Sequence, residues 1–248
     1  RMTRQHRGLR SYIWTRQHAL QLVLLLAAWW IALWWIAPAV VDWWAEVLGW
    51  AWPHLGLGPS DAVMLTKADP FGIPVHVIRT RFFVPVPNLW QWWFGALVSV
   101  GLLAVSWLLS RERLPLIYGL RIMGFLGLVS LLSYEYLSSL AVSDVNRLLT
   151  DNMLDIGLAL LWLLPLVHAL VLYIFPLPVL LKVMATTAGL LFVAISIPLQ
   201  AASLAWLASE CSLLVAVPLY MLFTFLPQIV GQLGIYGLFM SLAPAPQY

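Results

Sequence analysis

Residues 19–41, ALQLVLLLAAWWIALWWIAPAVV, decide the fold class of this chain. The stretch contains no charged residue, and a helix of about 20 mainly apolar residues is long enough to cross a bilayer. Trp29, Trp30, Trp34 and Trp35 lie within it, and tryptophan gathers where a ring can touch both hydrocarbon and water. We therefore expect a membrane-spanning helix whose far end lies at a membrane interface.

The composition extends this expectation to the rest of the chain. Of the 248 residues, 62% are hydrophobic and 9% are charged, whereas a soluble domain carries about 25% charged residues. The net charge is only +3, and the single cysteine, Cys211, excludes an internal disulfide. Most of the chain must therefore face lipid or other apolar helices.

A basic arm, residues 1–18, precedes the first apolar stretch. It resembles the start of a signal peptide, but bulky Trp43 and Trp44 stand where a cleavage site would need small residues. We interpret the arm as a cytoplasmic topology signal in front of an uncleaved anchor. Its arginines can attract anionic lipid headgroups or nucleic acid, but a topology signal explains them fully, and we predict no nucleic-acid partner.

Five further stretches have the length and composition of membrane spans. We therefore predict an all-α, polytopic integral membrane helical bundle of about six transmembrane helices. Beyond Pro227, residues 228–243 can either continue the sixth helix or form a separate piece on the membrane surface. The predicted spans are residues 19–41, 91–110, 115–137, 154–175, 179–203 and 211–233, followed by a tail over 234–248.

The basic residues predict which side of the membrane each end of the chain faces, because cytoplasmic loops carry an excess of lysine and arginine. With a cytoplasmic N-terminus, nearly all acidic residues lie at the outer face, and the inner face receives the basic arm, Arg111, Arg113, Arg121 and Lys182. We therefore expect a bacterial-type inner (plasma) membrane protein with its N-terminus in the cytoplasm. Arg121 and Lys182 are expected to reach the headgroups by snorkelling.

The longest stretch outside the spans is an outer loop, residues 42–90. Residues 42–54 carry tryptophans at near-helical spacing, which is typical of an amphipathic helix lying along a membrane surface. Residues 71–87 combine Val, Ile and Phe with prolines, which favours a short extended segment that docks on the membrane domain or on a partner strand. The candidate interface residues in and after this loop are Trp43, Trp44, Trp50, Trp52, Arg79, Arg81, Trp90, Trp92 and Trp93.

A second outer loop is predicted over residues 138–153. This loop and the helix ends beside it hold the densest polar group near the membrane. The group can be a cation site, a polar docking face or a solvated connection between two spans. This acidic cluster consists of Glu135, Asp144, Arg147, Asp151 and Asp155.

His168 is the exception among the ionisable residues, because it lies well inside the fourth span. A lone histidine is a weak basis for a metal or haem site, so we expect a neutral side chain hydrogen-bonded to another helix. Glu210 and Cys211 could pair as a base and a nucleophile, but cysteine catalysis needs a nearby cation or histidine, and no basic residue follows Lys182. We therefore predict no catalytic residue, no metal and no cofactor other than bound lipid.

Glycines near the end of the chain offer another kind of interface. Gly231, Gly234 and Gly237 are spaced by three residues, so they place a groove on one helix face where a second helix can approach closely. Polar side chains within the spans, such as Thr186 and Gln200, are interpreted in the same way, as contacts between helices.

The leading functional hypothesis is a non-catalytic integral membrane subunit of a larger inner-membrane assembly, of the secretion, conjugation, envelope-assembly or respiratory type. Its expected partners are membrane lipids and other membrane-protein subunits. The first alternative is a transporter of lipids or small molecules with a cavity between spans four and six, lined by His168, Gln200, Gln228 and Gln232. The second alternative is an intramembrane enzyme centred on Cys211 or on the acidic cluster.

Overall fold

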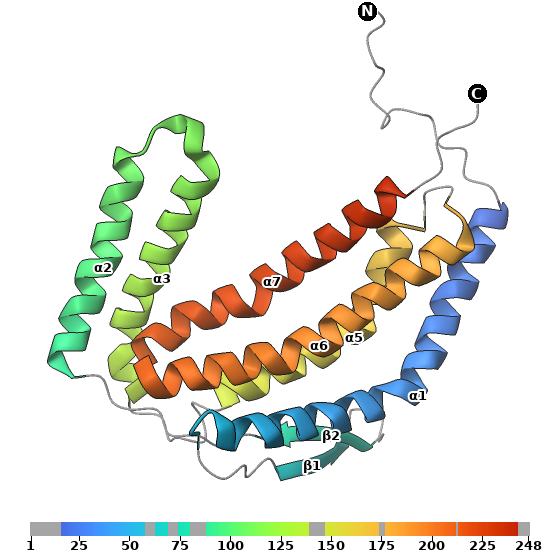
Figure 1. The fold of residues 1–248 in the computed structure, drawn as a ribbon, viewed down its shortest axis with the longest axis horizontal. Helices are drawn as coiled ribbons and strands as arrows, with labels where there is room; N and C mark the ends of the chain where they lie inside the picture. Colours follow the sequence, from blue (N-terminus) through green and yellow to red (C-terminus); the bar gives the residue numbers. More distant parts are fainter. Residues whose placement is uncertain are drawn as a thin grey trace, which may run out of the picture.

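The structure, a computed structural model, describes residues 16–57, 63–68, 74–79, 88–138, 147–173, 177–211 and 213–242. Within these residues, six helices are long and apolar enough to cross a bilayer. A two-stranded sheet lies at one end of the bundle (Figure 1). The prediction of a multi-pass helical membrane protein is therefore confirmed.

The first helix, α1 (Arg16–His54), is longer than predicted. A span over residues 19–41 and a separate surface helix after it were expected, but the helix is continuous and contains Pro38. Figure 1 shows that α1 changes direction part-way along and then runs across the lower end of the bundle. Proline produces such bends because it lacks the N–H that the carbonyl four residues earlier would accept. We name residues 39–54 the α1 arm.

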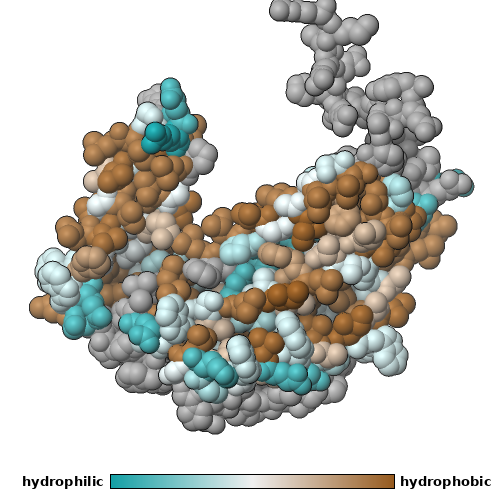
Figure 2. Space-filling view, in the orientation of Figure 1, coloured by the Kyte–Doolittle hydropathy of each residue, from teal (hydrophilic) through white to brown (hydrophobic). Residues whose placement is uncertain are grey.

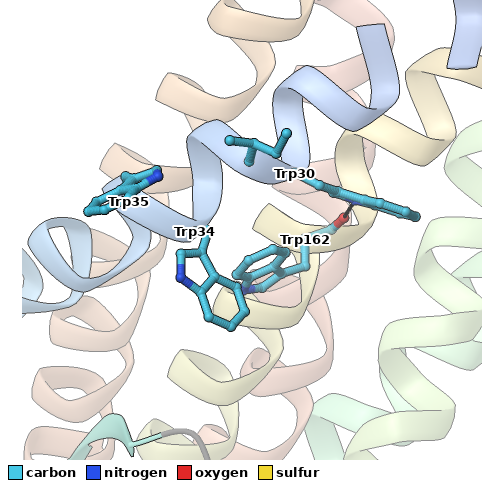
Figure 3. Close-up of a pocket in the computed structure, with 5 residues that line it drawn as sticks. Trp30, Trp34, Trp35 and Trp162 are labelled. Atoms are coloured by element: carbon cyan, nitrogen blue, oxygen red, sulfur yellow. Dashed lines mark hydrogen bonds between the residues drawn. The ribbon is translucent and has the colours of Figure 1, made fainter. Parts of the chain in front are cut away.

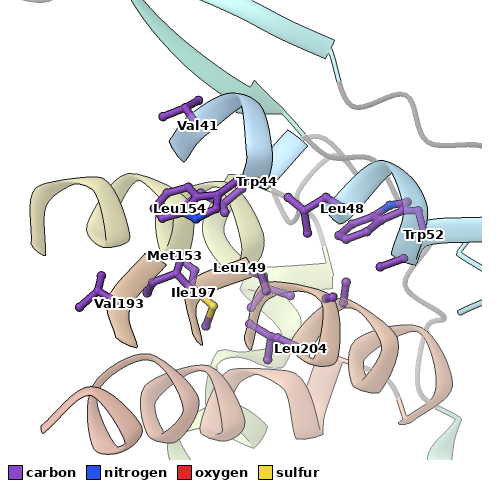
Figure 4. Packing of buried hydrophobic residues seen from close by; sticks show 14 of the residues in the cluster. Val41, Trp44, Leu48, Trp52, Leu149, Met153, Leu154, Val193, Ile197 and Leu204 are labelled. Carbon is purple, nitrogen blue, oxygen red and sulfur yellow. The ribbon is translucent and has the colours of Figure 1, made fainter. Parts of the chain in front are cut away.

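The α1 arm is amphipathic, and its apolar face packs on the protein. Trp44, Leu48 and Trp52 are 1%, 1% and 2% exposed and pack against residues of later helices (Figure 4). Trp43 and Trp50, on the other face of the arm, remain exposed. Trp44 and Trp52, which were expected to contact partners, are therefore part of the chain's own core.

A glycine-containing Schellman motif ends α1. Gly56 adopts a left-handed φ of 70°, which glycine reaches without steric cost. The N–H of Leu57 donates to the carbonyl of Trp52 at 3.1 Å, and the N–H of Gly56 donates to the carbonyl of Pro53 at 3.2 Å. Leu57 is buried in the same apolar cluster as Trp52, so the turn is also held by a hydrophobic contact.

Two short strands, β1 (Val63–Ala68) and β2 (Pro74–Arg79), pair antiparallel beside the α1 arm (Figure 1). The register places Ala68 opposite Pro74, the first residue of its strand, where a missing N–H is tolerated. The extended segment expected over residues 71–87 contains β2, whereas β1 lies before that segment and was not foreseen.

Helices α2 (Leu89–Leu108) and α3 (Leu114–Ser138) form a hairpin that is joined through a 3-10 turn, η1 (Arg111–Arg113). A capping box starts α2, because Asn88 accepts from the N–H of Gln91 at 2.8 Å and the Gln91 side chain accepts from the N–H of Asn88 at 3.0 Å. The hairpin lies apart from the other helices along most of its length (Figure 1).

The other three spans are α5 (Asn152–Val171), α6 (Val179–Cys211) and α7 (Leu213–Ser241), and a π-helical turn, η2 (Arg147–Asp151), precedes α5. Helices α6 and α7 are longer than a bilayer requires, and they run obliquely to the α2–α3 hairpin (Figure 1). Because α7 continues past Pro227 to Ser241, the sixth span does not stop at residue 233. The tail predicted from residue 234 onwards is helical over its first part.

The connections alternate between two ends of the bundle (Figure 1). One end, named the terminal end, holds the start of α1, the turn η1 and the end of α7. The opposite end, named the arm end, holds the α1 arm and the two strands. Figure 2 shows hydrophilic residues at the tip of the hairpin and near the arm end, with a mostly hydrophobic surface between them. This distribution suits a chain that crosses a bilayer between the two ends.

Two clusters of buried apolar residues hold the bundle together. The first joins the α1 arm to α5 and α6 at the arm end, and the second joins the start of α1 to α5, α6 and α7 near the terminal end. Neither cluster contains a described residue of α2 or α3. The hairpin attaches instead near the arm end, where the Ser130 hydroxyl donates to the carbonyl of Leu214 at 2.9 Å.

Candidate functional site

A buried polar seam runs along α6 where that helix meets α5 and α7. Its α6 members are spaced by three, four or seven residues, so they share one face of the helix. At 1.5 Å per residue, they extend over about 27 Å of helix. We name this feature the polar seam. It comprises Lys182, Thr186, Gly189, Ser196 and Gln200 of α6, Thr224, Gln228 and Gln232 of α7, and Trp29, His168 and Tyr173 beside them.

A chain of hydrogen bonds with a single direction forms the part of the seam nearest the terminal end. The indole of Trp29 donates to the Tyr173 hydroxyl at 3.0 Å, and that hydroxyl lies 2.7 Å from the hydroxyl of Thr186. The Thr186 hydroxyl donates to the carbonyl of Lys182 at 3.0 Å. Since its hydrogen is used there, Thr186 must accept from Tyr173, and the whole chain runs from α1 to α6.

His168 joins this chain from α5. Its Nδ1 lies 3.2 Å from the hydroxyl oxygen of Thr186, so His168 does bond to another helix. Because Thr186 has already donated its hydrogen to a carbonyl, Nδ1 must carry the imidazole hydrogen. The ring of His168 also lies beside the Gln232 side chain.

Tyr173 and Lys182 lie at the end of α5 and the start of α6. Burial raises the pKa of the Tyr173 phenol, and hydrogen bonds with Thr186 and Trp29 oppose this rise. Lys182 is only 1% exposed, although it was expected to snorkel to the headgroups. Among the described residues, its ammonium donates to one acceptor, the carbonyl of Tyr173 at 3.0 Å. The seam therefore holds a buried basic group at its terminal end.

Two glutamines of α7 form the part of the seam nearest the arm end. The amide nitrogen of Gln228 donates to Ser196 at 2.7 Å and to Gln200 at 3.3 Å. The amide nitrogen of Gln232 donates to the carbonyl of Gly189 at 3.1 Å. The structure thus brings together the four residues named for the transporter hypothesis, because the oxygen of Gln232 and the ring of His168 both lie beside Gly189.

Three oxygen atoms of the seam are buried: Thr224 Oγ1, Gln228 Oε1 and Gln232 Oε1. Tyr220 interacts with Thr224 and His168 interacts with Gln232, whereas Gln228 Oε1 has no hydrogen-bond partner among the described residues. The three oxygens occur four residues apart on α7, so they line one face of that helix on successive turns. A buried acceptor that lacks a donor costs about 1–3 kcal/mol. The seam can therefore accept hydrogen bonds from a small polar molecule.

Two prolines leave a backbone carbonyl without its usual helical donor, and each carbonyl accepts a hydrogen bond from another helix. Pro198 cannot donate to the carbonyl of Ala194, which instead accepts from the indole of Trp44 at 2.8 Å. Pro218 likewise leaves the carbonyl of Leu214 free for Ser130. These two bonds attach the α1 arm to α6 and the hairpin to α7.

A tryptophan-lined hollow of about 380 Å³ opens where α1 passes α5 (Figure 3). It is lined by Trp30, Ile31, Trp34 and Trp35 of α1 and by Trp162 of α5. The indole of Trp30 donates to the carbonyl of Trp162 at 3.3 Å. This hollow lies on the surface, and none of the four residues of the transporter hypothesis lines it.

The acidic cluster is only partly described by the structure. Asp151 is buried at the end of η2, whereas Asp155 is exposed on α5. Glu135 and Arg147 are placed by their backbones in α3 and η2, and Asp144 lies outside the described residues. Among the described residues, no three histidine, cysteine, aspartate or glutamate side chains are grouped to hold a metal.

Glu210 and Cys211 occupy the last two positions of α6. The Glu210 side chain is exposed, whereas only the backbone of Cys211 is described.

The glycines of α7 fall into two groups. A Cβ on Gly231 would collide with the ring of Phe192, so this glycine packs within the chain. Gly234 and Gly237 have open space beside them. Trp90 and Trp93 are exposed at the start of α2, and the Trp92 ring meets Trp93 edge-on at 5.0 Å. Arg79 ends β2, and Arg81 lies outside the described residues.

Sequence reasoning missed Lys182, Tyr173 and Trp29 as members of the seam. The spacing of Lys182, Thr186, Gly189, Ser196 and Gln200 along α6 was the signal that could have revealed a polar face. Trp29 and Tyr173 carried no such signal, because their polar atoms meet only through the fold.

No protein-family model, no curated protein and no solved structure matches this chain.

Proposed function

We propose that this chain is a non-catalytic integral membrane subunit that binds neighbouring subunits of a larger assembly through its α2–α3 hairpin. One observation carries the proposal: the hairpin adds no residue to either buried cluster of the described chain. Of the described α2 side chains, only Ser99 and Ser106 are buried, and both contact α3. The exposed side chains of α2, such as Trp93, Leu97 and Val100, are available to another chain.

The shape of the molecule supports the same proposal. A wide hollow separates α3 of the hairpin from α7 toward the terminal end, and the surface on both sides of it is largely hydrophobic (Figure 2). Contact between helices in a bilayer is stabilised by close packing rather than by expulsion of water. A partner helix in this hollow would pack against both walls at once. Lipid chains would pack against the same walls less closely.

The membrane and the orientation are part of the proposal. Arg16, Arg113 and Lys182 lie at the terminal end, whereas Asp42 and Glu46 lie on the α1 arm. Under the positive-inside rule, this distribution favours a cytoplasmic terminal end and an outer arm end. We also propose that the membrane is a bacterial-type inner membrane.

Purification of the full chain from its own membranes in a mild detergent, followed by mass determination of the complex, tests the subunit proposal. We expect stoichiometric partner chains. Replacing Leu97, 72% exposed on α2, by Trp should release them, whereas the matched change Leu24→Trp on exposed α1 should not. A monomer or a homo-oligomer would remove the proposal.

A second candidate function, passage of a small polar molecule along the polar seam, is supported by the three buried oxygens on successive turns of α7, one of which, Gln228 Oε1, has no donor among the described residues. The smallest species that could pass is the proton. We would test its passage by following proton flux with a pH-sensitive dye in vesicles that contain the purified chain. The wild type should exceed empty vesicles, and Gln228→Leu should abolish the excess. Equal proton flux through the wild type and Gln228→Leu would show that the flux does not pass along the polar seam.

A further inference from the structure

A second surface hollow opens between the α1 arm and α6. It has a volume of about 370 Å³ and is lined by Trp43, Glu46, Val47 and Trp50 of the arm and by Ile195 and Leu199 of α6. The four arm residues follow helical spacing, so they share one face. Ile195 and Leu199 are 50% and 55% exposed on a membrane-spanning helix, so the hollow has a polar rim on the arm and an apolar floor that faces lipid.

The rim carries negative charge. Glu46 is exposed between the two tryptophans, and exposed Asp42 lies one turn before it. Among the residues whose side chains the structure describes, which leave out those of β1 and β2, neither carboxylate has an ion-pair partner. A cationic group at the membrane surface would therefore be attracted to this position, and an anionic group would be repelled.

One aromatic wall of the hollow is held in place before any ligand arrives. The Trp50 ring stacks on the His54 ring, with centroids 4.5 Å apart and an angle of 27° between the planes. Nδ1 of His54 lies 2.6 Å from the carbonyl oxygen of Trp50, so it donates to that oxygen. A wall fixed in this way loses little freedom when a ligand binds.

We propose that this hollow binds the ammonium group of an ethanolamine phospholipid. The Glu46 carboxylate accepts a hydrogen bond from the ammonium, the rings of Trp43 and Trp50 flank it, and an acyl chain lies along Ile195 and Leu199. The phosphate then points away from the arm toward water.

The chemistry of the rim selects this headgroup among the common ones. A primary ammonium donates hydrogen bonds to a carboxylate, and such charge-assisted bonds are stronger than neutral ones. A choline headgroup offers the same charge for a cation–π contact but has no hydrogen to donate. A glycerol headgroup leaves the lipid anionic, and Asp42 and Glu46 oppose its approach.

The test uses the full chain in nanodiscs that contain equal amounts of ethanolamine, choline and glycerol phospholipids. After transfer to detergent, native mass spectrometry counts the lipid that remains bound. We expect the ethanolamine lipid to exceed each of the others by about threefold, as one exposed ion pair allows. Glu46→Gln should bring the three lipids to equal retention.

Glu210→Gln is the matched control, because Glu210 is also exposed near the arm end but does not line the hollow. This variant should keep the ethanolamine preference. Equal retention of the three lipids by the wild type, or an unchanged preference in Glu46→Gln, would overturn the proposal. Both variants change exposed side chains, so each should fold like the wild type.

Discussion

Trp43 and Trp44 are neighbours of the same type with opposite environments. Trp44 is 1% exposed and its indole donates to the carbonyl of Ala194, whereas Trp43 is 40% exposed on the rim of a surface hollow. Composition cannot distinguish them, because both suit a membrane interface. Helical spacing with Leu48 and Trp52 is what assigns Trp44 to the buried face.

Trp44→Ala should lower the free energy of unfolding by about 3 kcal/mol, because it leaves a cavity in the arm-end cluster. Trp43→Ala should change it by less than about 0.5 kcal/mol. Thermal unfolding of both variants in the same detergent measures the difference. Equal losses would show that the α1 arm does not pack as described.

Lys182 is a buried basic group whose described acceptor is one carbonyl. Lys182→Met keeps a long side chain and removes the charge, so the melting temperature should stay the same or rise. Lys182→Ala removes the packing as well and should lower it. A melting temperature that falls equally in both variants would show that the charge itself stabilises the fold.

Proline acts at the scale of the helix in this chain. Helix α1 contains Pro38 and changes direction part-way along (Figure 1), while Pro198 and Pro218 expose carbonyls that accept hydrogen bonds from Trp44 and Ser130. The sequence predicts that prolines interrupt helix bonding, but it does not say which distant donor uses the carbonyl that is released. That information exists only in the packing of one helix on another.

A double-mutant cycle tests this use of Pro198. Trp44→Phe should cost about 1 kcal/mol more in the wild type than in Pro198→Ala, where the new N–H competes for the carbonyl of Ala194. Unfolding of the four proteins in one detergent measures the coupling. Additive effects would mean that the proline and the indole act independently.

The α2–α3 hairpin depends on close approach of its two helices. A Cβ on Gly124 would lie 2.8 Å from the backbone oxygen of Ser99 and 2.7 Å from Cγ of Leu103. Gly124→Ala should therefore destabilise the hairpin by about 1–3 kcal/mol. Gly101→Ala, which meets nothing within 4 Å, should be neutral or stabilising. The yield of a cross-link between α2 and α3 measures the effect of each variant. Equal yields in Gly124→Ala and Gly101→Ala would contradict the predicted clash.

At the scale of the whole molecule, hydropathy was enough to predict six spans and the all-α class, because each span must satisfy its backbone within the bilayer. The polar seam was predictable only in part. His168, Gln200, Gln228 and Gln232 were grouped from their positions in the spans, but Lys182 was assigned to the headgroups. Tertiary packing buries its side chain, and a sequence does not contain that packing explicitly.

The central claim is that the hairpin faces another protein chain rather than lipid. Its most direct test places a photoreactive benzophenone side chain at position 97 of α2 and, as a control, at position 24 of α1, in native membranes. Leu97 and Leu24 are 72% and 58% exposed, so both sites are accessible. We predict a discrete cross-link to a second protein from position 97 and lipid adducts from position 24. Lipid adducts alone from both positions would contradict the account.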